Sequence, residues 1–260
     1  MLKDGFISFV KGVIIGLSSL VSGISCGSVF FSLDIYEKFI YSVNKIFKKP
    51  NRKFYLIVIP SLLGLLAAIL GGRDLIEYFI SNYEAQTIFL FIGIMAGGYR
   101  LLLRDSDIKY KTSNFIWFLF VFVLLLVMYY FLYDKVLFTI SNNFISSIVL
   151  GLAFGFIMFL PGFSLILDST LMGFHLNSFG FILLFILFVL IGLYLFCKIF
   201  YVFMKKYNEK AKVLIVALIL CSIVIAILHI DNFIFNFVNV FTTILTFLWG
   251  YIFIKNVVKE

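Results

Sequence analysis

The segment Gly12-Val13-Ile14-Ile15-Gly16, followed by Ser22-Gly23-Ile24-Ser25, interrupts an apolar run near the start of this chain. The pattern recurs 139 positions later as Gly151-Leu152-Ala153-Phe154-Gly155, followed by Pro161-Gly162-Phe163-Ser164. Glycine, serine and proline suit a helix that breaks inside the membrane and leaves backbone N–H groups for another partner. Interrupted segments at corresponding positions of two halves are typical of the binding site of a transporter.

The composition identifies an integral membrane protein that crosses the bilayer several times. Hydrophobic residues make up 63% of the chain and charged residues 13%, with a mean hydropathy of +1.14. Cys26, Cys197 and Cys221 lack the spacing of a disulfide framework or a zinc site, and we interpret them as packing residues. Neither His175 nor His229 has a second histidine three or four positions away, so we expect no metal and no cofactor.

Five or six apolar runs are long enough to cross a hydrocarbon core of about 30 Å. Two further apolar regions, 5–36 and 144–176, are too long for one crossing and carry the interruptions. Each is either one kinked helix or a re-entrant hairpin that enters and leaves on the same side. The six predicted spans are residues 54–72, 85–103, 115–133, 179–203, 212–230 and 234–254.

The distribution of lysine and arginine favours two re-entrant hairpins and an N-terminus in the cytoplasm. With that topology 19 of the 21 basic residues lie inside, and only Arg73 and Lys135 lie outside, as the positive-inside rule requires. Two full crossings per region would keep the same loops inside, but residues 5–36 are too few for them. The net charge of +8 therefore reports orientation and needs no nucleic-acid partner. Lys3 and Lys11 before an apolar stretch also fit a cleaved signal peptide, although the internal copy disfavours it.

This topology predicts an all-α polytopic fold, a single membrane domain over residues 1–260. Each half becomes one hairpin plus three transmembrane helices, an odd number, so the second half enters the membrane from the opposite side. We expect two inverted-topology repeats, residues 1–135 and 136–260, with the hairpin tips meeting near the midplane. We expect the protein to lie in the cytoplasmic membrane of the cell, with both chain ends facing the cytoplasm.

Several segments resemble the bacterial polyprenyl-phosphate transporter family, formerly a domain of unknown function. Its P-G-x-S-G-G-T-like motif corresponds to Ser22–Ser28, and its G-I-Y-E-R-like turn corresponds to Asp34-Ile35-Tyr36-Glu37-Lys38. Its second P-G-x-S-G-like motif reads Pro161–Leu165, and an F-F-x-G-x-x-x-G segment corresponds to Phe89–Gly97. Departures at several motif positions mark a divergent member of this family. They are Ser22, Cys26, Ser28, Leu165 and Asp168.

The resemblance implies a transporter, and no enzyme. It would move the lipid carrier undecaprenyl phosphate across the cytoplasmic membrane, so that the carrier is recycled in cell-envelope synthesis. The partners expected are this lipid phosphate and membrane lipids, with the oligomeric state open. Three alternatives remain: a transporter of another anion, a transport-inactive scaffold, and a membrane lipid phosphatase. A phosphatase calls for an acidic cluster and an arginine beside a serine, and neither stands next to these serines.

The residues of the interruptions suit an anionic head group. A phosphomonoester carries roughly −1.5 to −2 charges, and the free N–H groups of a helix N-terminus attract anions. The glycines let backbone approach the phosphate, the serines add donors, and the arginines end spanning segments. Packing of small residues is the alternative for the serines and the one favoured for Gly12, Gly16, Gly151 and Gly155. For the arginines the alternative is interfacial snorkelling. The predicted phosphate-binding residues are Ser22, Gly23, Ser25, Gly27, Ser28, Pro161, Gly162, Ser164, Arg73 and Arg100.

Inward movement of a phosphate also requires charge neutralisation. One negative charge entering a negative-inside cell costs about 2.3 kcal/mol per 100 mV. Co-moving protons would remove that cost, and acidic side chains in or beside the hairpins are the candidates. They are Asp168, Asp34 and Glu37, with a solvated loop as the alternative role of Glu37.

Overall fold

Every element in the part of the chain described here is a helix, which confirms the all-α fold class. The computed structural model describes residues 2–21, 23–45, 54–105, 111–132, 144–158, 179–230, 233 and 235–258. The elements are α1 (Leu2–Ser18), α2 (Cys26–Ser32), α3 (Tyr36–Asn44), a π-helix η1 (Phe54–Val58), α4 (Ile59–Gly71), α5 (Arg73–Asp105), α6 (Thr112–Leu132), α7 (Phe144–Ile157), α9 (Phe179–Lys206), α10 (Asn208–Leu228) and α11 (Phe237–Val258).

Each of the six predicted spans contains a helix. Four stretches within the described ranges are long and apolar enough to cross a membrane: Arg73–Arg100, Leu183–Lys206, Asn208–Leu228 and Phe237–Val258. Three shorter apolar helices accompany them, at Tyr55–Gly71, Thr112–Val127 and Ser147–Phe156. Large apolar side chains of α6, α9 and α11 are exposed on the outside of the molecule, which fits contact with lipid.

Two boundaries differ from the sequence-based prediction. Helix α5 begins at Arg73, twelve residues before the predicted span, and bends at Tyr83, whose φ of −142° and ψ of 48° are not helical. The region after Asp34, interpreted above as a possible solvated loop, forms the amphipathic helix α3. Its buried face carries Phe39, Ile40 and Val43, a spacing of three and four residues that places them on one side.

Close helix crossings are made by glycines, which confirms the packing role favoured for the two G-x-x-x-G motifs. Helix α1 crosses α4 at Gly12 and Gly16, and α7 crosses α9 at Gly151 and Gly155. A Cβ atom on Gly16 would lie 2.6 Å from the carbonyl oxygen of Leu65, which is too close for any side chain. Small residues let backbones approach in this way in membrane proteins.

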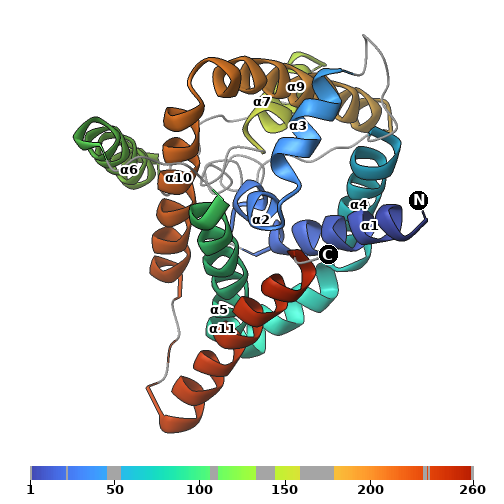
Figure 1. Ribbon diagram of the computed structural model, residues 1–260. Helices are drawn as coiled ribbons and strands as arrows, with labels where there is room; N and C mark the ends of the chain where they lie inside the picture. The colour runs from blue at the N-terminus through green and yellow to red at the C-terminus, as the bar shows by residue number, and fades with distance from the viewer. Residues whose placement is uncertain are drawn as a thin grey trace.

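Helix α2 lies in the middle of the molecule (Figure 1). It contacts α1, α3, α5 and α10. Eight of the described helices pack in four pairs: α1 with α4, α7 with α9, α5 with α11, and α6 with α10. The last two pairs join helices from opposite halves of the chain. In Figure 1 they lie below α2 and to its left.

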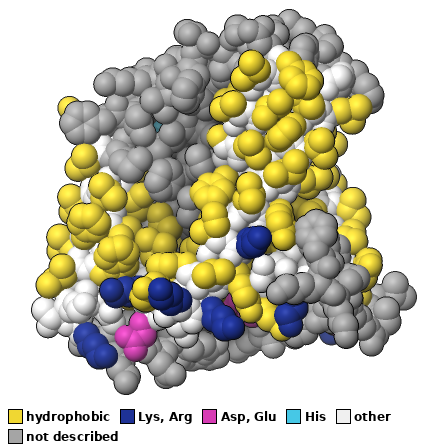
Figure 2. Space-filling view, turned by 90° about the horizontal axis from the view of Figure 1, so that it is seen from above, with side chains coloured by type: hydrophobic (Ala, Val, Ile, Leu, Met, Phe, Trp, Pro, Cys, Tyr) yellow, Lys and Arg dark blue, Asp and Glu magenta, His cyan; other side chains and the backbone are white. Residues whose placement is uncertain are grey.

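An aromatic cluster surrounds α2 and links it to α9. Phe30 contacts Phe39 with ring centroids 4.9 Å apart, and Tyr36 contacts Phe200 at 5.7 Å. Phe30, Tyr36 and Phe39 are all at most 1% exposed. Figure 2 shows hydrophobic side chains over much of one outer face and most of the visible lysines and arginines along one edge. That separation is expected where a protein passes from lipid into an interface.

Candidate substrate-binding site

The first interruption is a break between α1 and α2 that rests on α10. Helix α1 ends at Ser18, and Gly23 follows with a φ of +84°, a conformation that favours glycine. A Cβ atom on Gly23 would lie 2.7 Å from the Cα atom of Ala226 on α10. Both its dihedral angle and its position against α10 therefore require glycine at this point.

A long-range hydrogen bond joins the two sides of this break. Lys11 lies about two turns before the end of α1, and its ammonium donates to the carbonyl oxygen of Leu33, just after α2, at 3.0 Å. The two partners are separated by 22 residues of sequence. Helices α1 and α2 are thus tied to each other on the two sides of the turn that contains Gly23.

Ser222 of α10 holds both sides of the turn with one hydroxyl group. It donates to the carbonyl oxygen of Gly23 at 3.3 Å and accepts from the backbone N–H of Ser25 at 3.4 Å. Ser222 is completely buried. The N–H of Ser25, one of the groups proposed for an anion, therefore has a protein partner in this structure.

Two serines of the motif are fully enclosed in the apolar core. Ser25 precedes the first residue of α2, and Ser28 lies in its first turn; neither is exposed to any extent. The hydroxyl of Ser28 has no hydrogen-bond partner in the described part of the molecule. A buried hydroxyl without a partner costs about 1–3 kcal/mol, so this group is an unexplained polar atom at the centre of the fold.

The break also contacts the helix that leads into the second interruption. The thiol of Cys26 donates to the carbonyl oxygen of Met158 at 2.8 Å. Met158 directly follows α7 and stands three positions before Pro161. The first motif and the approach to the second are therefore neighbours, although 132 residues separate the bonded pair.

The structure brings part of the predicted site together. Gly23, Ser25, Gly27 and Ser28 form one buried unit, with Gly27 inside α2. The other hairpin residues of the prediction lie outside the described residues. They are Ser22, Pro161, Gly162, Ser164 and Asp168.

The two arginines lie at opposite ends of α5 and do not share one site. Arg73 is the first residue of that helix and is exposed. The guanidinium of Arg100, also exposed, donates to the hydroxyl of Tyr251 on α11 at 2.6 Å. Helix α2 meets α5 near this end, where a Cβ atom on Gly98 would lie 2.7 Å from the carbonyl oxygen of Ser32.

Asp34 and Glu37, two of the proton-coupling candidates, are on the surface. Asp34 has a φ of +56° and forms an ion pair with Lys38 at 2.7 Å. It occupies the glycine position of the family's turn, and the positive φ explains why a glycine suits that place. Glu37 is exposed in the first turn of α3.

Lys11 and Ser222 are polar residues of the site that the sequence reasoning missed. The positive-inside rule places Lys11 among the basic residues on the cytoplasmic side, but only 9% of this residue is exposed. Its place inside an apolar region was the available signal, because ionisable residues there are usually functional. Ser222 stands in an ordinary apolar span, and nothing in the sequence connects it with Gly23.

The break between α1 and α2 lies within a region that known proteins share. A family model described as undecaprenyl phosphate translocase-like matches residues 15–235. The chain belongs to this translocase-like family. A polyprenyl-phosphate transporter of Staphylococcus aureus is 31% identical over 108 residues, which cover 42% of this chain and 38% of the relative. No solved structure matches the chain. Its apolar helices and its family mark this translocase-like protein as a multi-pass membrane protein.

Proposed function

We propose that this protein moves undecaprenyl phosphate across the cytoplasmic membrane, with the phosphate bound at the break between α1 and α2. The observation that carries the proposal is the hydroxyl of Ser28, completely buried and without a partner in the described residues. A phosphate oxygen would accept from this hydroxyl. A hydrogen bond to a charged group contributes about 1.5–3 kcal/mol, enough to offset the cost of the unpaired donor.

A buried cation beside the same break supports the choice of an anionic ligand. The ammonium of Lys11 makes one described hydrogen bond, to Leu33, and keeps two further protons for other acceptors. A charged side chain inside a membrane is costly and usually has a partner of opposite sign. A lipid phosphate passing along α2 would supply that charge.

The two halves form inverted repeats in this proposal, and the helix pairing supports it. Helices α1 and α4 pair within the first half, as α7 and α9 do within the second. Helices α5 and α11, and equally α6 and α10, pair between halves. An exchange of this kind is what two related halves around a common axis produce. The contact between Cys26 and Met158 would then bring the two interruptions to one binding site.

Proton coupling is part of the proposal, with Asp168 as the acidic group that accompanies the phosphate. Asp34 and Glu37 are weaker candidates because both are exposed at the surface, and Asp34 is already paired with Lys38. A test is to replace Asp168 by Asn and to measure transport in vesicles with and without an imposed pH gradient. Transport that keeps its wild-type dependence on the gradient would exclude Asp168.

The function is tested by reconstituting the protein into vesicles that contain a fluorescent polyprenyl phosphate. We expect the labelled lipid to become accessible to an external quencher only when the protein is present. In cells, deletion should cause the carrier lipid to accumulate in the outer leaflet. Release of inorganic phosphate from the lipid by the purified protein would instead indicate a phosphatase.

A further inference from the structure

A groove opens between α3 and the C-terminal end of α9, away from the break. Its volume is 540 Å³, within the range of about 300–1,000 Å³ typical of ligand sites. Lys38 and Tyr41 of α3 and Tyr201 and Lys205 of α9 line it, together with Asn208 of α10. The polar groups of the lining are therefore two ammonium groups, two phenol hydroxyls, one amide and the carboxylate of Glu37.

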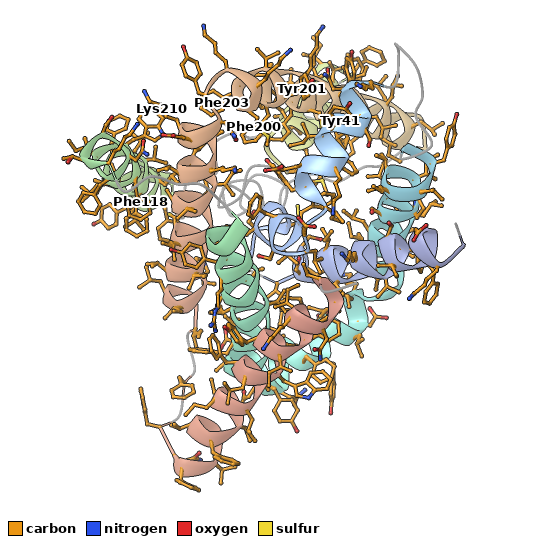
Figure 3. All side chains as sticks on the ribbon, viewed as in Figure 1. Tyr41, Phe118, Phe200, Tyr201, Phe203 and Lys210 are labelled. Carbon is orange, nitrogen blue, oxygen red and sulfur yellow. The ribbon has the colours of Figure 1, made fainter. Side chains whose placement is uncertain are left out.

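The two tyrosines hold the walls of the groove together. The rings of Tyr41 and Tyr201 lie 6.1 Å apart. Figure 3 labels both side chains, on α3 and α9. The ammonium of Lys45 lies over the Tyr41 ring, 4.3 Å from its centroid. Lys38 is paired with Asp34, whereas Lys205 has no ion pair among the described residues.

The charge of this groove favours an anion. Lys38 and Lys205 in the lining and Lys45 beside it carry three positive charges. Glu37 in the lining and Asp34 beside it carry two negative ones. The surplus is positive, and the ammonium of Lys205 is the group left to neutralise a ligand. Several donors around one cation fit a phosphomonoester, which has three terminal oxygens that accept hydrogen bonds.

The surface beside the groove favours an anion that carries an apolar chain. Tyr201, Met204 and Lys205 share one face of α9 because they are three and four residues apart. On the neighbouring face Leu195 and Val202, seven residues apart, are 42% and 58% exposed. An amphiphile would thus place its tail along α9 and its head group beside Lys205, whereas inorganic phosphate would leave this apolar surface unused.

The groove is connected with the break through α2, the shortest α-helix among the described residues. Helix α2 has 7 residues, equivalent to about 10 Å, and α3 follows it after a short turn. Lys11 binds the carbonyl of Leu33 within that turn. A phosphate leaving Ser28 along α2 would therefore meet the ammonium of Lys11 before it reaches the groove.

We propose that this groove, lined by Lys38, Tyr41, Tyr201, Lys205 and Asn208, is a second docking site for the polyprenyl phosphate head group. The inference rests on the proposed function and adds a second binding position at the surface end of the path of the lipid phosphate. The lipid waits there with its head group in the groove and its tail along α9, before entry to the break or after exit from it.

The test is equilibrium binding of radiolabelled farnesyl phosphate to the full-length protein in neutral phosphatidylcholine nanodiscs. Binding is compared between Lys205→Gln and Lys206→Gln, a matched control because Lys206 is the next residue but does not line the groove. All proteins carry Ser28→Ala, so that binding at the break does not obscure the result. We expect Lys205→Gln to weaken binding about fivefold, in keeping with a partly exposed charge, and Lys205→Arg to retain it.

The outcomes separate this inference from the proposed function. Equal affinity of Lys205→Gln and the control, or equal displacement of the probe by phosphatidylglycerol or inorganic phosphate, would overturn the docking site. If Lys205 controls binding but wild-type vesicles show no lipid movement between leaflets, the groove is supported and the transport proposal fails.

Discussion

Replacing Ser28 by alanine separates a binding role from a packing role, because the two predict opposite results. The hydroxyl of Ser28 is buried and has no partner among the described residues. Its removal relieves a penalty of about 1–3 kcal/mol, partly offset by the small cavity that remains. We therefore expect the free energy of unfolding to rise by about 1 kcal/mol, or about 2–4 °C in melting temperature.

Transport should fall in the same variant. A hydrogen bond from Ser28 to a phosphate oxygen contributes about 1.5–3 kcal/mol, so its loss weakens binding by about tenfold to a hundredfold. The assay is movement of a fluorescent polyprenyl phosphate in vesicles, at a lipid concentration below half-saturation. A residue that only packs would show no such loss.

Ser18→Ala is the matched control. Ser18 is also fully buried beside the break between α1 and α2, but its hydroxyl donates to the carbonyl oxygen of Ile15 at 2.7 Å. That carbonyl also accepts from the backbone N–H of Ser19, so it stays satisfied in the variant. We expect transport unchanged and stability lower by at most about 1 kcal/mol. Wild-type transport by Ser28→Ala would refute the assignment of its hydroxyl to the phosphate.

Three further substitutions test the region around the break. Gly23→Ala should lower the free energy of unfolding by at least about 2 kcal/mol because of the positive φ of Gly23 and its contact with α10. Gly71→Ala is the control, because the space around Gly71 is open and its stability should not fall. Equal melting temperatures of the two variants would contradict the requirement for glycine at position 23. Asp34→Gly should raise stability by about 1 kcal/mol, since the exposed pair with Lys38 contributes little; a lower melting temperature would show that the pair matters more than the backbone. Lys11→Met should leave the protein folded, as measured by monodispersity in detergent, but reduce vesicle transport at least about tenfold. Unchanged transport would show that Lys11 has only a structural role, through its hydrogen bond to Leu33.

The helical spans and their glycine crossings were accessible from sequence because both depend on local composition. Apolar runs of sufficient length predict helices wherever they occur, and the spacing of Gly12 and Gly16 already indicated a close crossing. The kink at Tyr83 was not predictable, since no proline or glycine marks it. The helical state of residues 36–44 was concealed by their mixed polarity, although Phe39, Ile40 and Val43 have helical spacing.

The candidate site was predictable only in its local part. The residues from Gly23 to Ser28 share one motif, so their proximity follows from the sequence itself. The contribution of Ser222 depends on α10 crossing the turn, a contact between positions 197 residues apart that no pattern in one sequence reveals. The same limit applies to Arg100, which the sequence placed at a phosphate and the structure places against Tyr251.

The exchange of partners between α5 and α11, and between α6 and α10, has a consequence for biogenesis. A polypeptide severed between α6 and α7 would yield two fragments, each with a helix whose natural neighbour is on the other fragment. Neither piece alone would mature, whereas simultaneous synthesis of both should restore a working assembly. The interlocked pairing also means that α10 and α11 must be synthesised before α5 and α6 acquire their final contacts.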